Sequence, residues 1–192
     1  MKRVCVFCGS RPGSRPGYAK AARELGVAIA EAGMGLVYGG ASVGLMNDVA
    51  EAVLGGGGEV IGVIPQSLSD REVAHRGLTE LHVVPTMHER KALMYSLSDG
   101  FIVLPGGFGT LDELFEILTW AQLGMHAKPI ALFNVEGFWE PLTSLLFHFV
   151  REGFVPDDQL ALLSVDIDAR ALLTKMKAWT KPVLGPKWLD KA

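Results

Sequence analysis

Apolar residues along the chain fall into short β-prone runs that alternate with longer amphipathic stretches. Short apolar runs bounded by turn residues are typical of buried strands, and apolar spacings of three and four are typical of helices. The short runs predict strands at Val4–Cys8, Gly35–Tyr38, Glu59–Ile64, Leu81–Val84, Gly100–Leu104 and Pro129–Phe133. The longer stretches predict helices at Tyr18–Ala32, Leu45–Leu54, Met87–Ser98, Thr110–Leu123, Phe138–Glu152 and Ala169–Trp179.

Strands that alternate with helices pair in parallel through right-handed crossovers. We therefore expect an α/β fold: a doubly wound, Rossmann-like and mostly parallel sheet of about six or seven strands, with helices on both faces. No shift in composition marks a domain boundary, so we expect one domain over residues 1–180 and a loosely held tail at 181–192. The polar segment 66–80 is expected to be a surface loop that holds at most a short helical turn.

Three loops rich in Gly or Ser follow predicted strands, at Gly9–Gly17, Gly39–Gly44 and Pro105–Thr110. In doubly wound sheets the ligand lies beyond the carboxyl ends of the strands. We expect the three loops to converge on one crevice there, although glycines at 39–44 could also serve only a tight turn. The candidates for ligand contact in the first two loops are Ser10, Gly39, Gly40 and Ser42.

The stretch from Pro105 to Glu113 joins a predicted strand to a predicted helix and contains three glycines. Such a turn favours a phosphate, because backbone amides and the positive end of the helix dipole point at it. The glycine spacing fits neither a P-loop nor a dinucleotide fingerprint. Thr110 and Glu113 have the spacing of a capping box. Alternatively, the phosphate lies on the Gly106–Thr110 amides, and Glu113 faces a neutral hydroxylated group such as a ribose.

Arg90 falls on the apolar arc of its predicted helix, together with Met87, Met94 and Leu97. A buried guanidinium must find an anion or a carboxylate, because burying it unpaired is very costly. Its partner could be a ligand or an internal salt bridge. Lys91 points towards a flank, where it could be an ordinary surface lysine or contact the ligand.

Two motifs resemble those of a known family. Residues 105–113, Pro-Gly-Gly-Phe-Gly-Thr-Leu-Asp-Glu, match the pattern Pro-Gly-Gly-x-Gly-Thr-x-x-Glu, and residues 87–91 match Met-His-x-Arg-Lys. Both are similar to signatures of the Lonely Guy family of cytokinin-activating nucleotide hydrolases. Many bacterial members of that family carry a lysine decarboxylase label. The resemblance runs from Val4 to about Phe154.

This resemblance implies hydrolysis of the N-glycosidic bond of cytokinin riboside 5′-monophosphates, and of AMP, to a free base and ribose 5-phosphate. It implies that Arg90 and Glu113 are the catalytic pair, and that the enzyme is at least a homodimer. The residues that it places around the nucleotide are Glu72, Lys91, Gly106, Gly107, Gly109, Thr110 and Thr119.

The composition of the chain limits the kinds of partner that it can bind. The net charge is −3 with no basic run, which argues against a nucleic-acid partner, and no apolar run reaches the length of a membrane span. We expect no signal peptide. Cys5 and Cys8 are an odd number of residues apart, so a strand would place them on opposite faces as buried, reduced thiols, which fits a cytoplasmic protein. The histidines lack zinc-ligand spacing, and neither a metal nor a cofactor is expected.

Two other functions compete with hydrolysis. The chain could carry a nucleotide or a molybdenum cofactor without turning it over. The presence of both Arg90 and Glu113 favours the enzyme, because a phosphate carrier has no need of a carboxylate beside its anion. Lysine decarboxylation usually needs pyridoxal phosphate held on a lysine, and the sequence shows no such constellation.

Overall fold

A computed structural model describes residues 1–69 and 73–183. Its sheet has seven parallel strands in the order β4-β3-β2-β1-β5-β6-β7. The strands are β1 (Arg3–Phe7), β2 (Gly35–Tyr38), β3 (Val60–Pro65), β4 (Glu80–Val84), β5 (Gly100–Val103), β6 (Ile130–Phe133) and β7 (Leu163–Asp166). The predicted parallel α/β sheet is confirmed. The edge strand β7 was not predicted, and the expected tail is described only as far as Val183.

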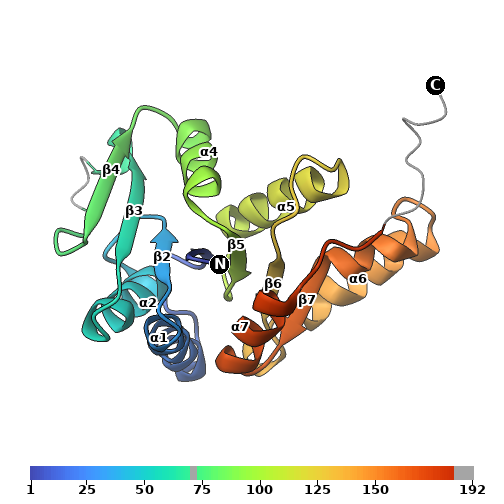
Figure 1. Cartoon of the computed structure of the whole chain (residues 1–192), viewed down its shortest axis with the longest axis horizontal. Coiled ribbons are helices and arrows are strands. Elements are labelled where there is room, and N and C mark those ends of the chain that lie inside the picture. The colour runs from blue at the N-terminus through green and yellow to red at the C-terminus, as the bar shows by residue number, and fades with distance from the viewer. Residues whose placement is uncertain (70–72, 184–192) are drawn as a thin grey trace.

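Helices cover both faces of the sheet (Figure 1). They are α1 (Pro16–Glu31), α2 (Gly44–Gly55), α3 (Gln66–Ser69), α4 (Met87–Leu97), α5 (Phe108–Gln122), α6 (Glu140–Arg151) and α7 (Ala169–Ala178), with 3-10 turns at Val135–Gly137 and Asp157–Leu162. Helices α1, α2 and α7 bury their apolar sides on one face, and α4, α5 and the start of α6 on the other. Within the described residues, no helix combines the length and apolar character needed to span a membrane.

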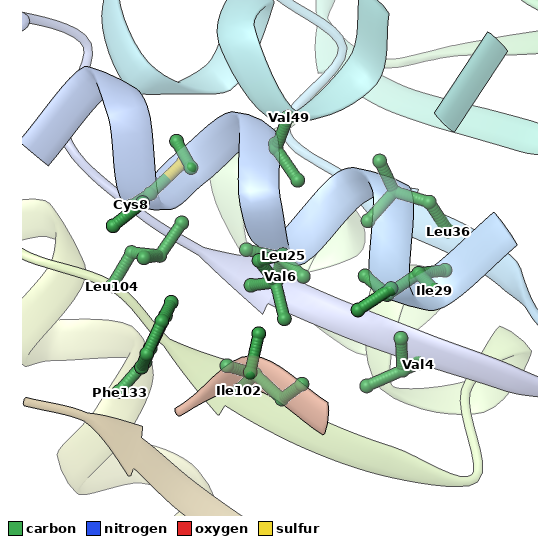
Figure 2. Packing of buried hydrophobic residues seen from close by; sticks show 14 of the residues in the cluster. Val4, Val6, Cys8, Leu25, Ile29, Leu36, Val49, Ile102, Leu104 and Phe133 are labelled. Carbon is green, nitrogen blue, oxygen red and sulfur yellow. The ribbon is translucent and has the colours of Figure 1, made fainter. Parts of the chain in front are cut away.

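The central strand β1 is packed from both sides. Figure 2 shows Leu25 and Ile29 of α1 lying over Val4 and Val6 of β1, and all four are almost completely buried. Gly26, on the same helix, lets α2 approach closely, because a Cβ there would collide with Ala52. This layer fixes β1 and therefore the loop that leaves its carboxyl end.

The two cysteines occupy opposite sides of β1. Cys5 belongs to the cluster under α4 and α5, whereas Cys8 belongs to the cluster under α1 and α2. Both are buried free thiols. The prediction that their spacing separates them across the strand is confirmed.

The chain reverses its direction of winding between the neighbouring strands β1 and β5, because α1 and α5 leave them on opposite faces of the sheet. The amide of Gly9 donates to the carbonyl of Pro105 at 3.0 Å, and the amide of Leu45 donates to the carbonyl of Gly9 at 3.1 Å. Gly44 packs so tightly that a Cβ there would collide with the backbone of Ser10. The three loops therefore converge at the carboxyl ends of the strands, as the sequence predicts.

Leu25→Ala should lower the free energy of unfolding by about 2–5 kcal/mol, since it leaves a cavity in the layer over β1. Val27→Ala is the matched control, because Val27 lies on the same helix and is 41% exposed. We expect it to change stability by less than about 0.5 kcal/mol. Urea denaturation of the three proteins measures the difference, and equal losses for both variants would contradict this packing.

Candidate active site

Helix α5 begins earlier than the sequence suggests. Its N-cap is Gly107, no side chain caps it, and Phe108 is its first residue. Thr110 therefore lies inside the first turn, with its side chain against Gly106. The capping-box interpretation of Thr110 and Glu113 is wrong, and no acidic residue lies in the first turn. The N-terminus of α5 thus has no carboxylate to repel an anion.

The turn before α5 leaves room for a ligand. A Cβ added at Gly107 or Gly109 would meet nothing within 4 Å, so the backbone is open on its outer side. Beside it lies a cavity of about 570 Å³, bounded by residues 9–13 of the β1–α1 loop, by Pro105–Phe108 and by Phe138. The orphan amides of the first helical turn face this end of the sheet and can bind a phosphate.

Arg90 reaches the same region from α4, the helix beside α5 in Figure 1. Thr86 caps α4, because its hydroxyl oxygen accepts from the amide of Glu89 at 3.2 Å, so Arg90 lies at the end of the first turn. The guanidinium donates through Nε to the carbonyl of Val63 at 3.1 Å and lies against Gly39, where a Cβ would collide with Nη2. Its position is set by backbone on two sides.

Glu113 is the carboxylate that Arg90 pairs with. Nη1 of Arg90 lies 3.3 Å from Oε1 of Glu113, and the two side chains are only 13% and 9% exposed. The sequence left open whether the guanidinium finds a ligand or an internal carboxylate, and the structure shows the carboxylate. Burial raises the pKa of Glu113 to about 7, although the positive charge of Arg90 opposes the shift. Near neutral pH the group therefore exists both as a carboxylate and as a carboxylic acid.

Lys91 is not an ordinary surface lysine. Its side chain is 10% exposed, and Nζ lies 3.1 Å from Oδ2 of Asp112 and 2.9 Å from Oε1 of Glu116. Burial alone would lower the pKa of Lys91, but the hydrogen bonds to Glu116 and Asp112 outweigh it and the pKa is raised. Lys91 thus joins α4 to α5 beside the Arg90–Glu113 pair.

The β2–α2 loop forms the wall behind Arg90. Gly39 and Gly40 are buried, and Gly40 adopts a positive φ of 73° that favours glycine. Ser42 is exposed, and its hydroxyl donates to the carbonyl of Val73 at 3.3 Å. Ser10 is also exposed, at the edge of the 570 Å³ cavity. Of the four candidates from the first two loops, Ser10 thus borders the cavity and Gly39 contacts Arg90, whereas Gly40 packs on β3 and Ser42 bonds to Val73.

Two of the predicted ligand residues are not brought together with this group. Thr119 lies six residues after Glu113, which is about 9 Å further along α5 and on a different face of the helix. Its hydroxyl donates to the carbonyl of Phe115 at 2.6 Å, and it borders a separate apolar cavity of about 180 Å³ between α5 and α6. Glu72 lies outside the described residues.

This arrangement combines an anion-binding helix end with a buried carboxylate whose pKa is near neutrality. In the part of the chain that the structure describes, no cluster of three His, Cys, Asp or Glu side chains could hold a metal ion. The geometry suits a phosphorylated substrate whose reacting atom lies near Glu113, about one helical turn from its phosphate.

The comparisons with known proteins agree with the motifs. The family described as "Possible lysine decarboxylase" matches residues 46–176. A protein of Oryza sativa subsp. japonica, named cytokinin riboside 5′-monophosphate phosphoribohydrolase LOG, is 47% identical over 192 residues, which cover 100% of this chain and 79% of that protein. The cytokinin riboside 5′-monophosphate phosphoribohydrolase of Rhodococcoides fascians is 54% identical over 80% of this chain and 78% of its own length. The chain belongs to the Lonely Guy (LOG) family.

Solved structures show how widely the fold of this LOG-family chain is shared. The molybdenum cofactor binding protein of Rippkaea orientalis superposes with a TM-score of 0.71 over 93% of this chain and 97% of its own. Its sequence identity is 22%, so this likeness concerns the fold alone.

Sequence reasoning missed two features that position the LOG-family motif residues. The carbonyl of Val63, which accepts from Arg90, is a backbone group and leaves no trace in the residue pattern. Glu116, which pairs with Lys91, had a signal in its spacing of four from Asp112, because that spacing places two acids on one face of α5.

Gly39→Ala should misplace Arg90 without unfolding the protein, because the new methyl group would occupy the position of Nη2. We expect turnover to fall about tenfold to a hundredfold, as is typical for a misplacement of about 1 Å. Gly55→Ala is the control, since a Cβ at Gly55 would meet nothing within 4 Å and Gly55, like Gly39, has no positive φ. Equal activity of both variants in a base-release assay would contradict the contact between Gly39 and Arg90.

The raised pKa of Glu113 makes stability depend on pH in a definite direction. The folded protein holds the proton more tightly than the unfolded chain, so this contribution is fully present below pH 4.5 and is lost as the pH rises through about 7. Glu113→Gln cannot ionise. Its free energy of unfolding should therefore gain on that of the wild type by about 3 kcal/mol between pH 4.5 and 8. Urea denaturation across this range gives the difference, and parallel profiles would contradict it.

Proposed function

We propose that this chain hydrolyses the N-glycosidic bond of cytokinin riboside 5′-monophosphates and releases the free base and ribose 5-phosphate. The observation that carries the proposal is the buried Arg90–Glu113 pair beside the uncapped N-terminus of α5. The names of relatives at 47% and 54% identity support it. Hydrolysis explains the site better than the decarboxylase description of the family does, because it assigns a task to both Arg90 and Glu113.

The 5′-phosphate binds to the amides of the Gly106–Thr110 turn, where Gly107 and Gly109 leave the backbone open. This places the ribose over α5 and directs C1′ towards Glu113. The phosphate thus supplies binding energy far from the reacting bond and holds the sugar in position. Lys91 binds on the same side in this proposal, where its charge partly offsets the carboxylates of Asp112 and Glu116.

Cleavage of the bond between C1′ and the base nitrogen builds positive charge on the sugar, as in other glycoside hydrolyses. Ionised Glu113 stabilises that charge and takes a proton from the attacking water, so that the water oxygen bonds to C1′. The electrons of the broken bond leave with the base, which takes a proton from solvent, while Glu113 returns the proton of the attacking water to solvent. A pKa of about 7 lets Glu113 accept the proton and release it again near neutral pH.

Arg90 acts by its fixed charge. Guanidinium does not give up its proton at neutral pH, so Arg90 is not the acid that protonates the base. It keeps part of Glu113 ionised, orients that carboxylate, and offers hydrogen bonds to the departing base. Its anchoring on Val63 keeps it in place when the substrate enters.

The same site accepts AMP in this proposal, because none of the contacts described above is made to the side chain that distinguishes a cytokinin base from adenine. A single nucleotide, rather than a nucleic acid, fits a protein of net charge −3. The buried free thiols of Cys5 and Cys8 fit a cytoplasmic location.

The working form in this proposal is a homodimer. Helix α6 buries only Leu142, whereas Leu145 and Phe147 on it are 43% and 55% exposed. Phe154, just beyond its end, is 82% exposed. Large apolar side chains that stay exposed close together on the surface are typical of interfaces between subunits. Thr119, which borders the apolar cavity between α5 and α6, lies on this side of the chain.

Purified protein incubated with isopentenyladenosine 5′-monophosphate should release free base and ribose 5-phosphate in equal amounts. Chromatography of the reaction mixture measures both products. Glu113→Gln should lower kcat by about 10²–10⁴-fold, because it removes the carboxylate that pairs with Arg90. Arg90→Ala should lower it by about 10²–10³-fold. In the wild type, kcat/KM should rise with pH up to about 7, since ionised Glu113 is the active form.

Glu89→Gln is the matched control for charge, since Glu89 is an exposed carboxylate on α4 that lies next to Arg90 in sequence. It should keep the activity of the wild type. If the wild type binds the nucleotide but releases no base, the chain is a carrier, and hydrolysis is excluded for that substrate.

Phe147→Glu should convert the dimer to a monomer, because it replaces an exposed apolar side chain of α6 with a charge. Sedimentation velocity at micromolar concentration gives the mass of each protein. Val27→Glu, a similar change on the opposite layer of the fold, should leave the dimer intact. A wild-type mass near 20.7 kDa would contradict the homodimer.

A further inference from the structure

Residues 73–77 run along the turn between β2 and α2. The amide of Ser42 donates to the carbonyl of Val73 at 2.8 Å, and the amide of His75 donates to the carbonyl of Gly40 at 2.9 Å. Between these bonds, Ala41 and Ala74 form an antiparallel bridge. This segment, which we call the 73–77 clasp, therefore holds the backbone of the β2–α2 turn from outside.

The side chain of His75 fastens the clasp to the rest of the fold. It is 7% exposed, and Nε2 lies 2.7 Å from Oε1 of Glu51 on α2. Nδ1 accepts from the amide of Gly77 at 3.1 Å. Because Nδ1 is an acceptor, the ring hydrogen is on Nε2 and is donated to Glu51. One imidazole thus joins the clasp to α2 and to its own following turn.

The turn held by the clasp is the wall behind Arg90. Gly39 touches the guanidinium of Arg90. Gly40 packs against Val63 and Ile64 of β3, and a Cβ added at Gly40 would lie only 3.2 Å from each of them. Val63 is also the residue whose carbonyl accepts from Arg90. A shift of the Gly39–Gly40 peptide would therefore move the guanidinium relative to Glu113.

We propose that His75, through its hydrogen bond to Glu51, is a positioning residue that holds the Gly39–Gly40 turn against Arg90. It touches neither the substrate nor the reacting atoms. Glu51 acts together with His75, since the carboxylate of Glu51 is the group on α2 that accepts the hydrogen bond of the imidazole. The kinetic test rests on the proposed hydrolase activity, whereas the structural test below does not.

Two substitutions distinguish the contribution of one ring nitrogen of His75 from that of the other. His75→Asn keeps an acceptor near the position of Nδ1 but cannot reach Glu51, whereas His75→Gln can still donate to Glu51 but loses the contact with Gly77. With isopentenyladenosine 5′-monophosphate as substrate, His75→Asn should lower kcat about tenfold or more. KM should change less than about threefold, because the phosphate site on α5 is untouched. His75→Gln should restore most of the activity.

Glu51→Ala should reproduce His75→Asn, and the double variant should be no worse than either, since both remove the same contact. Glu51 is 58% exposed in its side chain, so this variant does not create a buried cavity. Glu31→Ala is the matched control for Glu51→Ala, because Glu31 pairs with Arg170 at 2.7 Å, is 54% exposed in its side chain, and lies on α1, on the face of the sheet opposite α4. It should retain the wild-type kcat.

Hydrogen exchange of the Ser42 and His75 amides measures the clasp without any substrate. These amides should exchange about tenfold faster in His75→Asn and Glu51→Ala than in the wild type, and His75→Gln should protect them. Unchanged exchange, or equal kcat for His75→Asn and His75→Gln, would overturn the proposal. If the wild type is inactive but exchange responds as expected, the hydrolase proposal fails while the clasp stands.

Discussion

The contact between Arg90 and Glu113 is the interaction around which the crevice is arranged. A guanidinium and a carboxylate that are both mostly buried stabilise one another only when each keeps further partners. Arg90 has the carbonyl of Val63, and α4 is tied to α5 a second time by Lys91. Because burial outweighs the charge of Arg90 in setting the pKa of Glu113, the pair keeps a proton acceptor available near neutral pH.

The topology of the sheet explains why these groups meet. In a parallel sheet the loops that follow the strands all lie at the carboxyl ends of the strands. The change of winding between β1 and β5 opens a crevice at that end of the sheet. This architecture was predictable, since the apolar runs are short and separated by helical spacing. The strand β7 was not, because it is a half-buried edge strand whose residues Leu163–Asp166 include two polar side chains and lack a continuous apolar run.

The site was predictable in its residues but not in its contacts. The position of Arg90 on an apolar arc indicated a buried charge, and the glycines at 106–109 indicated an anion site. That Arg90 pairs with Glu113 depends on how α4 and α5 pack across β5, which no local pattern encodes. Local spacing even suggested the wrong role for Thr110. The three-residue spacing of Thr110 and Glu113 fits a capping box, but the helix starts two residues earlier, at Phe108, without a side-chain cap. The His75–Glu51 contact left no local signal either.

The most direct test of this account is the pKa of Glu113 itself. Carbon-13 NMR of the glutamate side-chain carboxyl groups across pH 4 to 9, with Glu113→Gln to assign the signal, measures it without any substrate. The account predicts a midpoint at about 7. A midpoint close to the ordinary glutamate value of about 4.3 would contradict it, because Glu113 would then be a plain ion-pair partner of Arg90 rather than a proton acceptor tuned to neutral pH.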